Sequence, residues 1–459
     1  MHLQEYLNSL KDRSVAVIGI GVSNTPLIRL LLQNGIDVTA CDKRTRADLG
    51  TLAHELEQGG AKLQLGEDYL EGLDQDVIFR TPGMRPDLPQ LLAARERGSV
   101  ITSEMEVFFD VCPCSIIAVT GSDGKTTTTT MIAELLRASG RTVHVGGNIG
   151  KPLLAEAGAM QPGDSVVLEL SSFQLMTMKK SPHICVVTNL SPNHLDMHKG
   201  MEEYVASKEN IFLHQSAGDV AVFNLDNEIT CEQSRRAVGG VRLFSRRSSV
   251  ENGVYLRGEE IVRCRAGVES VVMTTADIKL PGIHNVENYM AAIAALDGLV
   301  DDETIRAFAR EFGGVEHRIE LVRTLDGVRY YNDSIASSPT RVIAGLKAQT
   351  QKIIMLAGGY DKKIPFEPMV PYVLEKVKYL ILTGATAEKI REAIVSHPDY
   401  DPTALTIEMS PDWDYAINHA RAVAKRGDVV SLSPACASFD FFANFEKRGE
   451  YFKEMVRSF

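Results

Sequence analysis

The clearest pattern along the chain is a short apolar run that ends in glycine and leads into an amphipathic, helical stretch. It occurs at RSVAVIGIG near residue 15, SIIAVTGSDGKT near residue 117 and QKIIMLAGGYD near residue 353. Such runs are typical of buried parallel strands, and their alternation with helices predicts an α/β fold. Residues 241–280 instead alternate apolar and polar positions between turn residues, which predicts a small antiparallel sheet.

Two breaks in this pattern give the expected domain boundaries. A Pro-Cys pair follows the helical stretch EMEVFFDV near residue 112, and a glycine pair interrupts the chain at 313–314. The predicted domains are a Rossmann-like domain over 1–112, a central α/β domain of P-loop type with the antiparallel sheet over 113–314, and a second Rossmann-like domain over 315–459.

The second glycine-ended run carries the strongest chemical signal. Backbone N–H groups at Gly121 and Gly124 can close on phosphate oxygens. The Lys125 ammonium adds a positive charge, and the Thr126 hydroxyl can reach a magnesium ion. Only two residues separate the glycines, whereas the usual P-loop has four. The sequence therefore predicts a shortened phosphate loop.

This loop cannot bind a nucleotide alone, and an ordinary strand-to-helix turn with a surface lysine is the alternative. A helix terminus contributes about 0.3–2 kcal/mol, whereas micromolar binding requires about 8 kcal/mol. Further contacts must therefore come from other parts of the chain.

Composition limits the class of function. The net charge of −11 argues against sequence-independent binding to nucleic acid or anionic membranes. No apolar run approaches the roughly 18 residues of a membrane span, and the first residues lack the apolar core of a signal peptide. The seven cysteines include no CxxC pair, which favours reduced thiols and no structural metal. We expect a cytoplasmic protein that acts on small molecules, without nucleic-acid partners or membrane insertion.

The first glycine-ended run resembles a dinucleotide-binding turn. Gly19 and Gly21 follow a strand, and Asp42 ends the next strand about 20 residues later. However, Asn24 replaces the third glycine that lets helix and strand pack closely. An NAD site and an inert turn are therefore alternatives to a nucleotide-diphosphate site with Asp42 or Lys43 near the ribose or base.

Polar residues in the central segment suggest a metal site. Glu169 lies inside the apolar run VVLELSSF, where an unpaired carboxylate would cost several kcal/mol to bury. Magnesium is the cation expected beside a phosphate loop, and a strand carboxylate satisfied by hydrogen bonds is the alternative.

Two further groups could join this site. The alternation of His194, Asp196 and His198 could suggest zinc, but the oxygen-rich surroundings favour His194 beside magnesium or the reacting phosphate. Lys208 on a predicted helix is, by spacing alone, equally well a solvated surface residue.

Taken together, the motifs resemble those of the Mur ligases, the ATP-dependent peptide-bond-forming enzymes of peptidoglycan synthesis. The resemblance covers essentially the whole chain. Within the family, LELSSFQL and SPACASFDFF with NFEKRG are most similar to members that join D-glutamate to UDP-N-acetylmuramoyl-L-alanine. The motifs that carry it, in the order of the family, are TGSDGKTT, GGNIG, LELSSFQL, NHLD, the lysine of ASKENIF, HNVEN, EHR, NDS and SPACASFDFFANFEKRGEYF.

The resemblance implies an ATP site with two magnesium ions. It implies that Lys208 is carbamylated by CO2, because an ammonium group cannot bind magnesium. The implied catalytic residues are Lys125, Glu169, His194 and Lys208; the implied metal ligands are Thr126, Glu169, His194 and Lys208; the implied ATP-binding residues are Gly121, Ser122, Asp123, Gly124, Lys125, Thr126, Thr127, Asn285, Asn288, Arg318 and Asp333.

The resemblance also implies sites for the other two substrates. Two departures affect them: Ile335 stands where many members have lysine, and either Lys362 or Lys363 could face D-glutamate. The implied UDP-substrate residues are Gly21, Val22, Asp42, Lys43, Gly83, Asn148, Ser171 and Gln174, and the implied D-glutamate residues are Ser337, Lys362, Ser438 and Phe445.

The implied reaction passes through an acyl phosphate and releases ADP and phosphate. The third domain would have to close over the nucleotide, and we expect a monomer. A folylpolyglutamate synthase is the nearest rival, but it would lack the N-terminal domain. Sister Mur ligases with other amino acids, an NAD oxidoreductase and a non-enzymatic ATP-dependent switch remain further alternatives.

Overall fold

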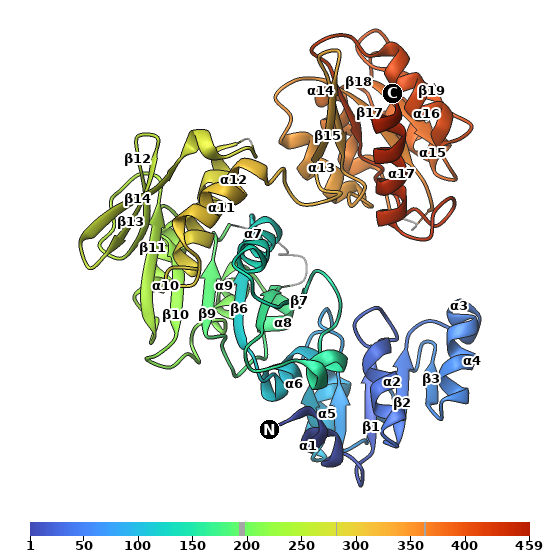
Figure 1. The fold of residues 1–459 in the computed structure, drawn as a ribbon. Helices are drawn as coiled ribbons and strands as arrows, with labels where there is room; N and C mark the ends of the chain where they lie inside the picture. Colours follow the sequence, from blue (N-terminus) through green and yellow to red (C-terminus); the bar gives the residue numbers. More distant parts are fainter. Residues whose placement is uncertain (192–197, 281, 362–363) are drawn as a thin grey trace. The chain divides into compact units, whose positions relative to one another are not determined.

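Three β-sheets follow one another along the described chain, with helices beside them (Figure 1). The computed structural model describes residues 1–191, 198–280, 282–361 and 364–459. They divide into two compact units, Met1–Phe312 and Gly313–Phe459. The predicted α/β class is confirmed, whereas the three-domain boundaries at 112 and 314 stay predictions. Among the described helices, none has the length and apolar composition to cross a membrane.

The first sheet is parallel throughout, with the strand order β3-β2-β1-β4-β5. Apolar side chains in β1 are fully buried, as expected for a strand covered on both faces. The order reverses between β1 and β4, and ligands of open α/β sheets bind outside the strand ends at such a point. The elements are β1 (Val15–Ile18), β2 (Val38–Asp42), β3 (Lys62–Leu65), β4 (Val77–Phe79), β5 (Val100–Thr102), α1 (Leu3–Asn8), α2 (Thr25–Gln33), α3 (Arg46–Leu49), α4 (Thr51–Gln58), α5 (Pro89–Glu96) and α6 (Glu104–Val111).

The central sheet is mixed, with the order β14-β13-β12-β11-β10-β9-β6-β8-β7. The predicted antiparallel strands are present, and they extend the edge of the parallel part. The strands are β6 (Ser115–Thr120), β7 (Val143–Gly147), β8 (Ser165–Glu169), β9 (Ile184–Val187), β10 (Val220–Asn224), β11 (Gly240–Ser245), β12 (Gly253–Arg257), β13 (Glu260–Arg265) and β14 (Val268–Thr274). The helices are α7 (Lys125–Ala138), η1 (Leu154–Ala159), α8 (Ser172–Leu175), α9 (Met201–Glu209), α10 (Glu228–Ser234), η2 (Thr275–Asp277), α11 (Ile283–Ala295) and α12 (Asp302–Glu311).

The third sheet forms the core of the second unit, with the order β15-β16-β20-β17-β18-β19. Its strands are parallel except for the β15–β16 hairpin. The elements are β15 (Glu320–Leu325), β16 (Val328–Asn332), β17 (Ile353–Gly358), β18 (Val377–Thr383), β19 (Thr406–Met409), β20 (Val429–Leu432), α13 (Pro339–Lys347), η3 (Glu367–Met369), α14 (Val370–Lys376), α15 (Ala387–Val395), α16 (Trp413–Val423) and α17 (Phe445–Ser458).

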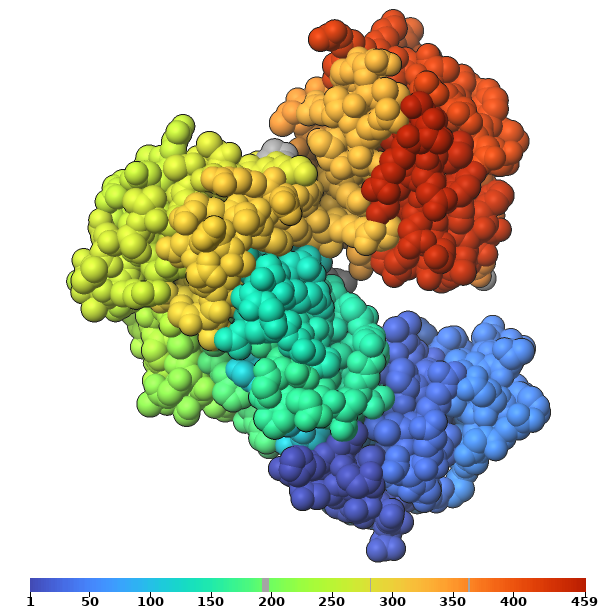
Figure 2. All heavy atoms as spheres, viewed as in Figure 1, coloured from blue at the N-terminus to red at the C-terminus, as the bar shows by residue number. Residues whose placement is uncertain are grey.

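Within the first unit, whose outer surface is coloured from blue to yellow in Figure 2, buried apolar side chains of the first and central sheets form one hydrophobic core. Polar contacts cross the same junction. The buried Arg80 guanidinium donates to Thr177 Oγ1 at 2.6 Å, and Arg85 pairs with Glu203 at 2.8 Å. The Glu104 carboxyl at the start of α6 accepts the Leu154 N–H at 2.9 Å. Polar contacts therefore join the two sheets in addition to the shared core.

Candidate active site

The predicted phosphate loop joins β6 to α7, and its glycines are required by its shape. Gly121 has φ +148° and Gly124 has φ +78°. A Cβ on Gly121 would lie 2.0 Å from Thr188 Oγ1, and one on Gly124 would lie 2.5 Å from Asn288 Oδ1. Neither position can accept a side chain without moving its neighbours.

Residues that follow β9 hold the loop in place. The Ser122 N–H donates to Asn189 O at 2.8 Å, and the Asp123 N–H donates to Asn189 Oδ1 at 2.9 Å. Ser122 Oγ lies 2.9 Å from the Tyr204 hydroxyl on α9. These bonds hold the loop in its observed shape.

The end of the loop is suited to an anion. Helix α7 begins after Gly124, which provides no capping side chain for the first N–H groups. Lys125 is the first residue of the helix, and its Nζ donates to Ser122 O at 2.8 Å. A positive side chain thus lies beside N–H groups that can bind phosphate oxygens.

Glu169 ends β8 next to this loop and is buried. Its carboxylate accepts the Thr126 hydroxyl at 2.7 Å and the Asn148 side-chain amide at 2.8 Å. These bonds satisfy the carboxylate within the protein, as expected if Glu169 is a strand carboxylate held by hydrogen bonds and not a metal ligand. They also bring together the hydroxyl and carboxylate oxygens that magnesium prefers.

Lys208 is deeply buried on α9, with 2% of its surface exposed, so it is not a solvated surface residue. Its Nζ lies 3.1 Å from Thr120 Oγ1 and 5.0 Å from the centre of the Tyr204 ring. Burial, reinforced by the charge of Lys125, lowers the pKa of Lys208 well below its usual value, while Glu169 acts in the opposite direction.

The histidine cluster is only partly described. His194 and Asp196 lie outside the described residues. The buried His198 stacks on Phe173 with ring centroids 5.0 Å apart, and its Nε2 lies 2.9 Å from Ser172 Oγ.

The asparagines predicted for the adenine site lie on the first turns of α11, and both are buried. Asn288 donates to Asn285 Oδ1 at 3.1 Å and accepts from Thr128 Oγ1 at 3.2 Å. Thr127 lies in the first turn of α7. The structure therefore brings the HNVEN helix to the phosphate loop.

The N-terminal turn after β1 is closed by its own polar groups. Asp42 accepts the Ile20 N–H at 2.7 Å and pairs with Arg44 at 2.8 Å. Burial raises the pKa of Asp42, but the bonds from Arg44 and the backbone outweigh it and lower the pKa. The Asn24 amide, in place of the third glycine, donates to Ile18 O at 2.9 Å. It thus fills the space between helix and strand.

The other predicted UDP-substrate residues follow the carboxyl ends of strands in the first and central sheets. Val22 and Lys43 are exposed, and a Cβ on Gly21 or Gly83 would meet nothing within 4 Å. In the central sheet, Asn148 is bonded to Glu169, whereas Ser171 and Gln174 form the capping box of α8.

In the second unit, Asp333 lies buried just after β16. Burial raises its pKa to about 7, against the opposing charges of Arg318 and Arg341. Its Oδ1 accepts the Ile319 N–H at 3.2 Å. The exposed Arg318 lies between two residues with positive φ, His317 at 62° and Ile319 at 47°.

The segments predicted to bind D-glutamate meet around the buried Arg448 on α17. Its guanidinium donates to Ser334 O at 3.0 Å and to Ala437 O at 3.2 Å. Ser334 Oγ in turn donates to Phe445 O at 2.7 Å. Ser337 and Ser438 neighbour these anchored positions in sequence, and Lys362 lies outside the described residues.

Comparison with known proteins agrees with this arrangement. The Mur ligase middle domain matches residues 119–296, and the Mur ligase, glutamate ligase domain matches residues 317–436. A relative from Acetivibrio thermocellus, UDP-N-acetylmuramoylalanine--D-glutamate ligase, is 51% identical over 99% of this chain and 98% of its own length. The chain belongs to the Mur ligase family.

Further Mur ligases support the same assignment. A Clostridium novyi protein with the same name is 50% identical over 99% of this chain and 98% of its own length. The structure of UDP-N-acetylmuramate-alanine ligase from Thermotoga maritima has a TM-score of 0.53 at 19% identity and covers 97% of this chain and 99% of that one. MurF from Acinetobacter baumannii has a TM-score of 0.53 at 17% identity, with 81% and 80% coverage. These two structures confirm the three-domain Mur ligase fold.

Several residues of this Mur ligase site were missed from sequence. Asn189 and Tyr204 hold the phosphate loop through Ser122. Asn189 lies just before the NHLD motif and Tyr204 just before ASKENIF. A polar residue after a strand end and a tyrosine one turn before Lys208 were therefore the available signals. Arg448 similarly lies in NFEKRG.

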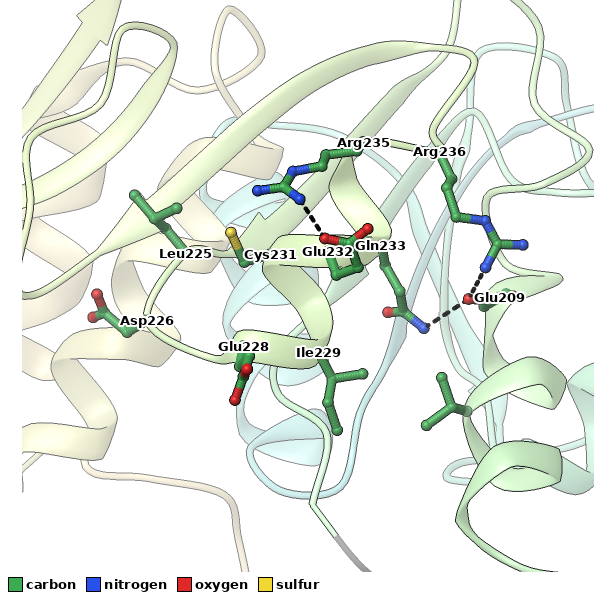
Figure 3. A pocket seen from close by; sticks show the side chains of 11 residues that line it. Glu209, Leu225, Asp226, Glu228, Ile229, Cys231, Glu232, Gln233, Arg235 and Arg236 are labelled. Atoms are coloured by element: carbon green, nitrogen blue, oxygen red, sulfur yellow. Dashed lines mark hydrogen bonds and ion pairs between the residues drawn. The ribbon is translucent and has the colours of Figure 1, made fainter.

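A groove of about 780 Å³ lies between α9 and α10 (Figure 3). Val205 and Glu209 line it, and Glu209 pairs with Arg236 at 2.6 Å. Val205 follows Tyr204 by one residue, and Glu209 follows Lys208 by one residue. Because successive residues of a helix point in directions about 100° apart, the groove lies on a different side of α9 from Tyr204 and Lys208. It therefore does not belong to the Mur ligase site described above.

Proposed function

We propose that this chain joins D-glutamate to UDP-N-acetylmuramoyl-L-alanine with ATP, in cytoplasmic peptidoglycan precursor synthesis. One observation carries the proposal: the chain is about 50% identical, over almost its whole length, to relatives named UDP-N-acetylmuramoylalanine--D-glutamate ligase. The phosphate loop beside Glu169 and Lys208 supports ATP use by the same chain.

The residues around the loop fit magnesium. The Thr126 hydroxyl oxygen and a Glu169 carboxylate oxygen lie 2.7 Å apart, and oxygen atoms of this kind are the ligands that magnesium prefers. We propose that these two residues hold the first ion and that His194 and Lys208 serve a second. When bound, magnesium would neutralise charge on the phosphates.

The ammonium form of Lys208 has no lone pair for a metal ion, so we propose that Lys208 serves the ion as a carbamate. Its buried, pKa-lowered amine is available in the uncharged form that reacts with CO2. The nitrogen lone pair would bond to the carbon of CO2, and the nitrogen would lose one proton. The product is a carbamate anion in place of a cation. The burial of the amine and its lowered pKa support this expected carbamylation.

The chain's own groups account for the two steps. In the first, the substrate carboxylate attacks the γ-phosphate of ATP to give an acyl phosphate and ADP. Lys125 and the N–H groups of the loop reduce the repulsion between the two anions. In the second, the amine of D-glutamate attacks the acyl carbon and loses a proton to solvent, an amide forms, and phosphate leaves with the bond electrons. We assign the binding of D-glutamate to Ser337, Lys362, Ser438 and Phe445, and closure over ATP to Arg318 and Asp333.

An amino-acid-dependent phosphate-release assay tests this function. With ATP and UDP-N-acetylmuramoyl-L-alanine, we expect turnover with D-glutamate and background rates with L-glutamate, L-alanine or lysine. Turnover with a different amino acid would assign the chain to a sister ligase. ATP binding without an amide product would favour the non-enzymatic switch.

A lysine variant tests the carbamate separately. Lys208→Ala should be nearly inactive and should regain part of its activity with added acetate, which can place a carboxylate in the vacated space. Lys199→Ala is the matched control, because Lys199 is exposed and pairs with Asp87 at 2.6 Å. Near-normal activity of Lys208→Ala without acetate contradicts the proposal.

A further inference from the structure

A continuous hydrogen-bonded path runs along the strand ends beside the phosphate loop. Strands β6, β9, β10 and β11 are neighbours in the central sheet. Thr188, after β9, donates its hydroxyl to Asp123 O in the loop at 2.6 Å. Asn224, at the end of β10, donates its amide to Thr188 O at 3.0 Å. Both side chains are buried, so these links are protected from water.

The path continues to the end of β11 through Asp226. The Asp226 N–H donates to Asn224 Oδ1 at 2.9 Å. Its carboxylate accepts the Ser245 hydroxyl at 2.6 Å and the Arg246 N–H at 2.7 Å. The position of Arg246 is therefore set by the same network that holds the phosphate loop.

Arg246 extends the path to the helix that carries the predicted adenine-site asparagines. Its Nε pairs with Glu287 Oε1 at 2.5 Å, and about a quarter of each side chain is exposed. Glu287 lies between Asn285 and Asn288 in α11. Asn288 returns to the loop region, because it accepts from Thr128 in α7.

The first turn of α11 needs such an anchor. Gly282 precedes the helix with φ +108° and offers no capping side chain. Asn288 Oδ1 also lies 2.5 Å from where a Cβ on Gly124 would be, so a small shift of α11 changes the space at the phosphate loop. The Arg246–Glu287 pair is the ionic link in this ring of contacts.

We propose that Arg246 and Glu287 are positioning residues that fix α11 relative to the phosphate loop, and thereby set affinity for the nucleotide. The proposal rests on the proposed ATP-dependent function. Neither side chain is assigned to touch a substrate. Their effect would reach ATP through the position of Asn285 and Asn288.

The test uses the full-length enzyme with the variants Arg246→Ala, Glu287→Ala and the double variant. We expect the KM for ATP and the Kd for ADP by calorimetry to rise about three- to tenfold, with kcat and the KM of the UDP substrate within about twofold. The double variant should be no worse than either single variant, because both remove one interaction. Arg246→Lys should recover part of the affinity.

The opposite end of α11 provides the matched control. Arg265 pairs with Asp297, just after the helix, and Asp297 keeps Arg263 at 3.1 Å when Arg265 is removed. Arg265→Gln should leave ADP affinity unchanged. Unchanged ADP affinity in Arg246→Ala and Glu287→Ala, or an equal loss in Arg265→Gln, overturns the inference. Failure of the proposed function would instead appear as wild-type enzyme without D-glutamate-dependent turnover, which leaves the ADP-binding test intact.

Discussion

The two glycine turns of the first unit share a strand–turn–helix path but differ in charge. After β1, Asp42 is bonded to Ile20 and Arg44, so its charge is satisfied within the turn. After β6, the positive side chain of Lys125 lies beside N–H groups of α7 that have no capping side chain. The first turn is closed by its own residues, whereas the second is arranged for an external anion.

The glycines differ in the same sense. A Cβ on Gly121 or Gly124 would overlap neighbouring side-chain atoms, whereas a Cβ on Gly21 would meet nothing within 4 Å. A glycine that faces neighbouring protein atoms is required by the fold. A glycine that faces open space is free to let a ligand approach. Similar sequence patterns can therefore have different physical causes.

The largest expected difference concerns the two lysines of the turns. Lys125→Ala should lower turnover by about 10²–10³, because the phosphates lose a positive neighbour. Lys43→Ala should mainly raise the KM of the UDP substrate, by about three- to tenfold, since Lys43 is exposed. Steady-state kinetics with each substrate varied will separate the two. Wild-type turnover in a folded Lys125→Ala variant contradicts the assigned phosphate site.

Alanine at the glycines is the next comparison. Gly121→Ala should destabilise the first unit by about 2–4 kcal/mol and abolish ATP use, because its Cβ would overlap Thr188. Gly21→Ala should change stability by less than about 0.5 kcal/mol and weaken only UDP-substrate binding. Urea unfolding and ligand titration will measure both effects. Equal stability loss at both positions would show that the turns do not differ as described.

These turns also show how far sequence alone reaches. The strand–glycine–helix pattern predicted the α/β class and placed Lys125, Thr126 and Glu169 near one another, because the ends of parallel strands meet at one edge of a sheet. It could not predict that Lys208 is buried, since the apolar residues of Met201–Glu209 do not gather on one face of the helix. The Asp42–Arg44 pair was also missed, because the sequence suggested that Asp42 or Lys43 lies near the ribose or base of a bound nucleotide.

Glu104, at the junction between the first and central sheets, gives the pH-dependent prediction. Burial raises the pKa of Glu104 to about 7, while its bonds to the Leu153 and Leu154 backbone oppose the shift. From about pH 4.5 to 7, the folded state keeps a proton that the unfolded state has lost, so stability falls as pH rises. Glu104→Gln carries no charge and should gain up to about 3 kcal/mol over the wild type at pH 8, with little difference near pH 4.5.

Urea unfolding of both proteins at pH 5, 6, 7 and 8 will show this divergence. The amide oxygen introduced by Glu104→Gln can still accept the Leu154 N–H, so the junction is kept. Parallel stability curves across this range would contradict a buried carboxyl that titrates near 7.

The smallest expected effect tests why the N-terminal turn is not a dinucleotide site. Asn24→Gly completes the three-glycine pattern but removes the bond to Ile18 O, which should cost about 1 kcal/mol. It should not create NADH binding in a fluorescence titration, because Asp42 remains bonded to Ile20 and Arg44. Asn34→Ala is the control at the other end of the same helix. The Asn34 amide donates to Leu30 O at 2.8 Å, and this bond is only partly buried. We therefore expect a stability loss of only a few tenths of a kcal/mol. NADH binding by Asn24→Gly would show that the missing glycine, and not the internal pairing of Asp42, separates this turn from a dinucleotide site.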